Sequence, residues 1–315
     1  MLITLDDVRA AADTIKGAAL RTPLLPAPWA GPDCWIKPES LQPIGAFKIR
    51  GAHNAVGSLE DEVRRRGVVT HSSGNHAQAL AHAARAYGVR AVVVMPETAP
   101  EVKRAATIAL GAEVVPVPPA ERESRAAALA AEQGLTLVPP YDHPHVIAGQ
   151  GTVGLEIVED LPDVDVVLVP IGGGGLASGV ATAVKGLRPR AAVIGVEPEL
   201  AGDAADSFRR GELVTWTDEQ RQRTIADGVR TPLSPLTWEH IRTLVDDVIT
   251  VTEDEIRAAT AAVVRGARLV AEPTGALSIA AQLFHCARLP AGRRVAVLSG
   301  GNVDPALLAE VLTLT

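Results

Sequence analysis

The feature that most constrains the fold is an alternation, from about residue 60 onward, of short apolar runs with alanine-rich amphipathic stretches. The apolar runs are almost uninterrupted, as in strands that are covered by helices on both faces of a sheet. Alternation of the two kinds of segment is typical of α/β proteins with parallel sheets. We therefore predict strands at 67–71, 91–95, 112–117, 164–171, 191–196 and 294–299.

Local signals mark the ends of several helices. The alanine-rich stretches 76–88 and 124–134 both end in glycine, which readily adopts the left-handed conformation found just after a helix. Thr4 with Asp7, and Thr252 with Glu255, match the capping box of a helix start. The segment 138–151, which contains several prolines and two histidines expected at the surface (His143 and His145), is predicted to cross between two domains.

Composition narrows the classes of partner. Hydrophobic residues make up 47% of the chain and the net charge is −7, with no basic stripe, so nucleic acid and anionic membrane surfaces are disfavoured. Cys34 and Cys286 lie far apart and outside any C-x-x-C pattern, which predicts neither a disulfide framework nor a zinc site. No secretory leader and no apolar run of membrane-spanning length is evident, so we expect a cytoplasmic protein.

Four consecutive glycines, Gly172, Gly173, Gly174 and Gly175, stand between a predicted strand and a helix. Without Cβ atoms their N–H groups can converge, and the helix start adds a positive dipole end, so the loop is predicted to bind a phosphate. The stretch also satisfies G-x-G-x-x-A with Ala177, and Glu197 ends the next strand about 20 residues later. A dinucleotide-binding dehydrogenase is therefore an alternative.

Two further features point to amino-acid chemistry. Lys48 stands between Phe47 and Ile49 just after a Pro-x-Gly turn, a setting typical of a lysine in a pocket. The turn after the first predicted strand contains Ser72, Ser73, Gly74, Asn75 and His76, whose polar groups and helix N–H groups suit a carboxylate. A lysine amine, a phosphate loop and a carboxylate turn together indicate a pyridoxal phosphate enzyme acting on amino acids.

The sequence resembles the serine/threonine dehydratase and serine racemase family of fold type II pyridoxal phosphate enzymes. The blocks that carry the resemblance run in order along the chain and include "KPESLQPIGAFKIRGA", "THSSGNHAQALA", "VPIGGGGLASG", "TIADGVR" and "VLSGGNVD". It implies a tryptophan synthase β-like α/β fold with mostly parallel sheets covered by helices. Residues 1–60 and 146–315 would form a large cofactor-binding domain and residues 61–145 a small mobile one. The resemblance also implies a homodimer, and it displaces the dehydrogenase alternative.

The resemblance also implies roles for individual residues. Lys48 would hold pyridoxal 5'-phosphate covalently and remove the Cα proton, while Ser73 would act as acid and base on the opposite face. The remaining cofactor contacts would be Phe47 beside the ring, Asn75 at the ring hydroxyl, Ser299 at the pyridine nitrogen, and Gly172, Gly173, Gly174, Gly175 and Leu176 at the phosphate. Substrate would be held by Ser72, Ser73, Gly74, Asn75, His76 and Arg125. Mg²⁺ or Ca²⁺ would bind Glu197, Ala201 and Asp203.

The implied reaction is β-elimination from L-threonine and L-serine, which yields a 2-oxo acid and ammonia. The alternatives are a serine racemase with elimination as a side activity, and a 3-hydroxyaspartate dehydratase. One departure bears on this choice, because Thr231 and Pro232 follow "TIADGVR" where the racemases have two serines, and Pro232 offers neither a hydroxyl nor an N–H. The chain ends soon after "VLSGGNVD", so no regulatory domain and no isoleucine feedback are expected.

Overall fold

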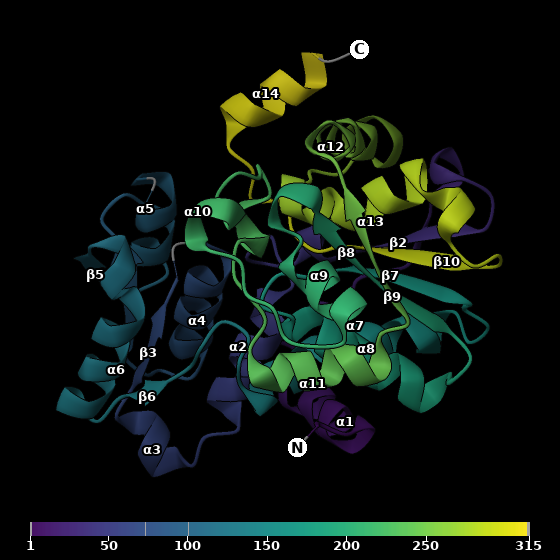
Figure 1. Cartoon of the computed structure of the whole chain (residues 1–315). Helices are drawn as coiled ribbons and strands as arrows, with labels where there is room; N and C mark the ends of the chain where they lie inside the picture. Colours follow the sequence, from purple (N-terminus) through teal and green to yellow (C-terminus); the bar gives the residue numbers. More distant parts are fainter. Residues whose placement is uncertain (1, 73, 100, 314–315) are drawn as a thin grey trace.

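The computed structural model describes residues 2–72, 74–99 and 101–313, which form two sheets covered by helices (Figure 1). The larger sheet has six strands in the order β1-β2-β10-β7-β8-β9, and the smaller has four in the order β5-β4-β3-β6. All strand neighbours are parallel except β1 and β2. The strands are β1 (Leu25–Pro26), β2 (Cys34–Pro38), β3 (Val68–His71), β4 (Ala91–Pro96), β5 (Glu113–Val117), β6 (Thr136–Leu137), β7 (Val166–Pro170), β8 (Ala192–Pro198), β9 (Asp247–Val251) and β10 (Arg294–Leu298).

The predicted α/β architecture is confirmed, and each of the six predicted strands is present within two residues at either end. The helices are α1 (Leu5–Thr14), α2 (Lys48–Gly57), α3 (Asp61–Arg65), α4 (Asn75–Ala86), α5 (Glu101–Ala109), α6 (Arg122–Gln133), α7 (Pro144–Asp160), α8 (Gly175–Leu187), α9 (Asp203–Arg210), α10 (Asp218–Arg221), α11 (Pro235–Leu244), α12 (Glu253–Ala267), α13 (Pro273–Phe284) and α14 (Pro305–Thr313). Both predicted capping boxes form, at Thr4 and Thr252, and Gly134 ends α6 with a φ of 66°. Among the described residues no helix is long and apolar enough to cross a membrane.

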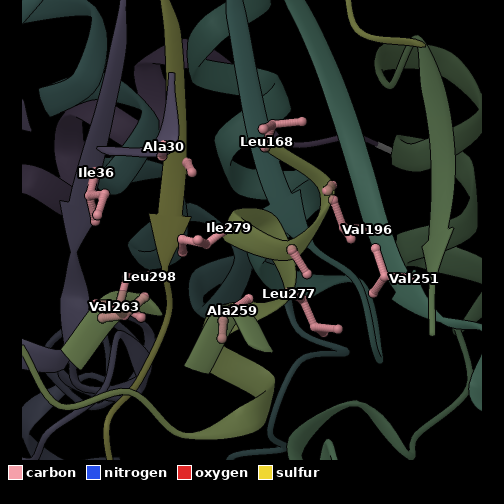
Figure 2. Packing of buried hydrophobic residues seen from close by; sticks show 14 of the residues in the cluster. Ala30, Ile36, Leu168, Val196, Val251, Ala259, Val263, Leu277, Ile279 and Leu298 are labelled. Atoms are coloured by element: carbon pink, nitrogen blue, oxygen red, sulfur yellow. The ribbon is translucent and has the colours of Figure 1, made fainter. Parts of the chain in front are cut away.

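The six-stranded sheet is buried on both faces, which explains its uninterrupted apolar runs. Successive side chains of a strand point to opposite faces, so Leu168 joins one core cluster and Val167 and Val169 join another. Figure 2 shows the first cluster, in which strand residues such as Leu168 and Val196 face Leu277 of α13. The second cluster packs against α7, α8 and α11.

Helix α2 packs with the elements of the four-stranded sheet. Ile49 and Ala52 of α2 lie in one core cluster with Leu80 of α4 and Val93 of β4. On the other face of the same sheet Val92 packs against α6. The helix that begins at Lys48 is therefore anchored to the smaller sheet, and Figure 1 shows this sheet beside the larger one.

The irregular segment that we predicted at 138–151, as a crossing between two domains, is shorter in the structure. Helix α7 begins at Pro144, a residue favoured in the first turn, and the Nδ1 atom of His143 accepts a hydrogen bond from the N–H of His145. Only residues 138–143 connect β6 to this helix without regular structure. His143 is half-buried and His145 is exposed.

Candidate active site

Most of the predicted site residues lie just after the carboxyl ends of β3, β7 and β10. In α/β sheets this is the end at which ligands bind. The N–H of Phe47 donates to the carbonyl oxygen of Ser299 at 3.0 Å, which joins the start of α2 to the end of β10. The side chain of Asn302 donates to Oδ1 of Asn75 at 2.8 Å, which joins the same region to the turn after β3. The contacts therefore gather residues that are more than 200 positions apart in the sequence.

Lys48 is the first residue of α2 and is half-buried. The Nζ atom donates to the carbonyl oxygen of Pro140 at 2.7 Å and lies 5.1 Å from the centre of the Phe47 ring. Burial lowers the pKa of the Lys48 amine to about 8. Burial is the cause of this pKa shift, and the described part of the chain shows no ion pair of Lys48. With this pKa roughly a tenth of the amine is neutral at pH 7 and available as a nucleophile and base.

The glycine loop has the backbone and packing that only glycine permits. Gly174 has a φ of 84°, and a Cβ on Gly172 would lie 2.7 Å from Cα of Val229. The side chain of Tyr141 covers Gly173 and Gly175, and Tyr141 follows the residue that accepts the bond from Lys48. Helix α8 begins at Gly175 without a side-chain cap, so its first N–H groups suit an anion. Leu176 lies buried in the first turn of that helix.

Asn75 is held in place by two partners. Its Nδ2 atom donates to Oε1 of Glu272 at 2.7 Å, while Oδ1 accepts from Asn302. Burial, and then the negative charge of Asp227, raise the pKa of Glu272 to about 8. The orientation of the Asn75 amide is thereby fixed, and Nδ2 keeps a second hydrogen for a bound molecule.

His76 lies below the turn and is buried. Its Nε2 atom is 3.0 Å from the carbonyl oxygen of Val138; because a carbonyl only accepts, Nε2 carries the hydrogen. Burial, and then the positive charge of Lys48, lower the pKa of His76 to about 3, so the ring is neutral. Among the residues that the structure describes, the buried Nδ1 atom has no hydrogen-bond partner. Buried polar atoms are rarely left unpaired, so this acceptor favours a site that is completed by a bound molecule.

The other predicted substrate contacts differ in whether they lie at the site. The Oγ atom of Ser72 accepts from the N–H of Gly74 at 3.3 Å, which shapes the turn. Ser73 lies outside the described residues. Arg125 is on the surface of α6 and pairs with Glu132 at 3.2 Å, and the contacts of the described residues do not connect it to the site. The buried Ser299 contributes its backbone carbonyl oxygen to the link with Phe47.

The predicted cation ligands lie together, and one of them, Glu197, already has hydrogen-bond partners. Glu197 ends β8, and its two carboxyl oxygens accept from the N–H groups of Ala204 and Ala205 at 3.3 and 2.7 Å. Asp203 begins α9, and Ala201 lies in the preceding turn. Burial, and then repulsion by Asp203, raise the pKa of Glu197; burial also raises that of Asp203, although the nearby Arg221 opposes this.

The charge at this position is partly balanced by the protein itself. The Nη1 atom of Arg221 lies 3.8 Å from Oδ2 of Asp203. No group of three or more acidic, histidine or cysteine side chains that could hold a metal ion occurs among the described residues. With Glu197 committed to backbone N–H groups and Asp203 facing a guanidinium, this donor set does not fit a required divalent cation.

Three residues that were not assigned individual roles from the sequence complete the site: Tyr141, Glu272 and Asn302. Of the three, Glu272 could most readily have been recognised as a candidate site residue from the sequence, because it is an isolated acid between Ala271 and Pro273 in an otherwise apolar stretch. Tyr141 is one of only two tyrosines in the chain, but it stands in the segment that we interpreted as a crossing. Their contacts with the glycine loop and with Asn75 depend on the fold.

The chain is similar to known proteins over nearly its whole length. The family model described as "Pyridoxal-phosphate dependent enzyme" matches residues 15–300. The chain is 42% identical to the L-threo-3-hydroxyaspartate ammonia-lyase of Saccharomyces cerevisiae, with 98% of this chain and 96% of that protein covered. It is 43% identical to the L-threonine ammonia-lyase of Thermotoga maritima, with 99% and 78% covered. The structure of maize serine racemase superposes with a TM-score of 0.93 at 37% identity, covering 98% of this chain and 97% of that one.

The fold and the site define an enzyme of amino-acid chemistry built on two mostly parallel sheets. The chain belongs to the pyridoxal-phosphate dependent enzymes of fold type II, in the family that includes ammonia-lyases and serine racemases. This membership replaces the dinucleotide-binding alternative for the glycine loop.

Proposed function

We propose that this protein is a pyridoxal phosphate-dependent ammonia-lyase that converts L-threonine and L-serine to a 2-oxo acid and ammonia. The observation that carries the proposal is the buried Lys48 amine, whose pKa is about 8 and which Pro140 and Tyr141 connect to the glycine loop. A second support is the 43% identity, over nearly the whole chain, to a protein named L-threonine ammonia-lyase.

The residues present fit pyridoxal phosphate. Lys48 would hold it covalently, with Phe47 beside its ring, and the uncapped start of α8 with Gly172–Gly175 and Leu176 would bind its phosphate. Asn75 and Ser299 would contact its ring. When bound, the cofactor withdraws electrons from the substrate and so makes the Cα–H bond acidic.

The side chains of this protein have separate tasks in the proposed reaction. The turn at residues 72–76 binds the substrate carboxylate, for which the N–H groups at the start of α4 are placed. Once the substrate amine has displaced it from the cofactor, the freed amine of Lys48 would remove the Cα proton; the β-hydroxyl would take up a proton and leave as water, and hydrolysis of the resulting enamine would give the 2-oxo acid and ammonia. Glu272 and Asn302 orient Asn75, and His76 stays neutral and adds no positive charge beside the amine.

A second candidate function is that of a serine racemase or an L-threo-3-hydroxyaspartate ammonia-lyase. Two of the similar proteins have these names. Racemisation needs a second acid and base opposite Lys48, and Ser73 is the residue predicted for this role. Arg125, the predicted substrate contact, pairs with Glu132 of the same helix, which supports a neutral substrate over an acidic one.

The candidates separate in one assay. L-Threonine, L-serine and L-threo-3-hydroxyaspartate are offered to the holoenzyme, and both 2-oxo acid and D-amino acid are quantified, with Lys48→Ala as the inactive control. Oxo acid from threonine and serine, without D-product, supports the proposal. Substantial D-serine that disappears in Ser73→Ala makes the protein a racemase, and a strong preference for hydroxyaspartate makes it an acidic amino-acid lyase.

The remaining predictions extend this proposal. Lys103 of α5 pairs at 2.6 Å with Asp227, close to the stretch that covers the glycine loop, so movement of residues 61–145 relative to the rest would open and close the site. The homodimer and the cytoplasmic location stay predictions. Mg²⁺ or Ca²⁺ at Glu197, Ala201 and Asp203 is untested, and the contact of Arg221 with Asp203 argues against a requirement for it.

A further inference from the structure

Arg221 is an arginine whose side chain is buried next to the predicted cation ligands. It is only 4% exposed, at the end of the short helix α10. Its Nη1 atom lies 3.8 Å from Oδ2 of Asp203, and that buried oxygen has no hydrogen-bond partner among the described residues. A buried carboxylate requires a nearby positive charge or protonation, and Arg221 is the cationic partner in the ion pair of Asp203.

The other contacts of Arg221 extend along the segment that follows α9. Its Nε atom donates to the carbonyl oxygen of Arg230 at 3.0 Å, and its Nη atoms donate to the carbonyl oxygen of Trp216 and to Asp218. One guanidinium therefore holds together both ends of residues 216–230 and connects them to the acidic pair. A guanidinium suits this position because it has five donors in a fixed plane and does not lose its proton.

The end of this segment packs against the glycine loop. Val229, beside Arg230, packs so closely on Gly172 that a Cβ there would lie 2.7 Å from its Cα atom. Leu233 and Thr237 pack in the same way on Gly174. The order of residues 216–230 thus fixes one wall of the predicted phosphate site.

We propose that Arg221 supplies, from within the chain, the positive charge that balances Asp203 and Glu197 and orders residues 216–230, so that this position needs no divalent cation. A cation bound to Asp203, at about 2.0–2.1 Å for Mg²⁺ or about 2.3–2.6 Å for Ca²⁺, would lie close to a guanidinium that is 3.8 Å from the same carboxylate, and the two positive charges would repel each other. Removal of the guanidinium should convert the acidic pair into a position where a divalent cation stabilises the fold.

The test compares Arg221→Gln with the wild type by thermal unfolding of the holoenzyme, in EDTA and in Mg²⁺ or Ca²⁺. We expect a wild-type Tm that is the same in both conditions. In EDTA the variant should unfold about 6 °C or more below the wild type, and either cation should restore a large part of that loss. The matched control is Arg223→Gln, because Arg223 is exposed and its Nε donates to the carbonyl oxygen of the nearby Gln220.

Three results would overturn the inference: a wild-type Tm that rises with Mg²⁺ or Ca²⁺, an Arg221→Gln variant as stable as Arg223→Gln, or a destabilised variant that no cation rescues. If Arg221→Gln does not fold, calorimetric titration of wild-type holoenzyme with Ca²⁺ decides, since binding of one ion per chain below about 1 mM contradicts the proposal. None of these measurements uses substrate, so their outcome is separate from that of the proposed function.

Discussion

The replacement of Arg50 by methionine tests how the helix that begins at Lys48 is held in place. Arg50 is fully buried two residues after Lys48, and its guanidinium bonds to Glu39 at 2.7 and 2.8 Å. It also bonds to Glu156 of α7 at 2.6 and 2.9 Å. Lys37 of β2 completes the group through a 2.6 Å bond to Glu156. Two acidic and two basic side chains therefore balance inside the protein.

The expected effect follows from this balance. Arg50→Met leaves Glu39 and Glu156 buried with only Lys37 to compensate, and removal of one partner from a buried ion pair costs about 3–5 kcal/mol of the free energy of unfolding. For a chain of this size each kcal/mol lowers Tm by about 2–4 °C, so a fall of about 6–20 °C is expected. Cofactor affinity should also fall, because α2 positions Lys48.

The assay is thermal unfolding of the holoenzyme together with two matched variants. Arg50→Met combined with Glu39→Gln removes one charge of each sign and should recover part of the loss. Arg9→Met removes an exposed ion pair with Asp6 and should change stability by less than about 1 kcal/mol. The reasoning is refuted if Arg50→Met is no less stable than Arg9→Met, or if the double variant is no more stable than Arg50→Met.

Three further predictions concern the site. Gly173→Ala places a methyl group against the Tyr141 ring and should weaken pyridoxal phosphate binding roughly tenfold in a cofactor titration; an unchanged Kd would contradict the packing. The pKa of Lys48 is about 8 against an ordinary 10.5, so cofactor uptake should level off above about pH 8, and a midpoint near pH 10 would be inconsistent with burial. Between about pH 8 and pH 10.5 Lys48 keeps its proton in the unfolded chain but loses it in the folded protein. The free energy of unfolding of the cofactor-free protein should therefore increase as the pH rises through this range. Lys103→Gln removes a partly exposed pair with Asp227 and should change Tm little while raising KM up to about fivefold; an unchanged KM would show that the pair does not act on the site.

The sequence predicted the strands that are plain apolar runs and missed those that are not. Strand β2 contains Lys37, a charge that ordinarily excludes a buried strand. In the structure this lysine is buried because Glu156, 119 residues away, and the carbonyl oxygen of Thr22 accept its bonds. Strands β1 and β6 have two residues each, and β9 begins at Asp247, so none of them shows a clear pattern.

The same distinction applies to the site. Lys48, the glycine loop and the turn after β3 are local patterns, so they could be predicted from neighbouring residues. The pairing of Asn75 with Glu272 spans 197 residues, and only the fold brings the two together. The salt bridge between Arg221 and Asp203 was missed for a related reason, because the residues between them form a segment without long helices or strands.

The central claim is that Lys48 carries pyridoxal phosphate and performs the proton transfer. The direct measurement is to reduce the cofactor-loaded enzyme with borohydride, digest it, and locate the pyridoxyl group by mass spectrometry. We predict that the group is found on Lys48 and that Lys48→Ala neither retains it nor turns over L-threonine, L-serine or L-threo-3-hydroxyaspartate. A label on another lysine, or an active Lys48→Ala enzyme, would contradict the account.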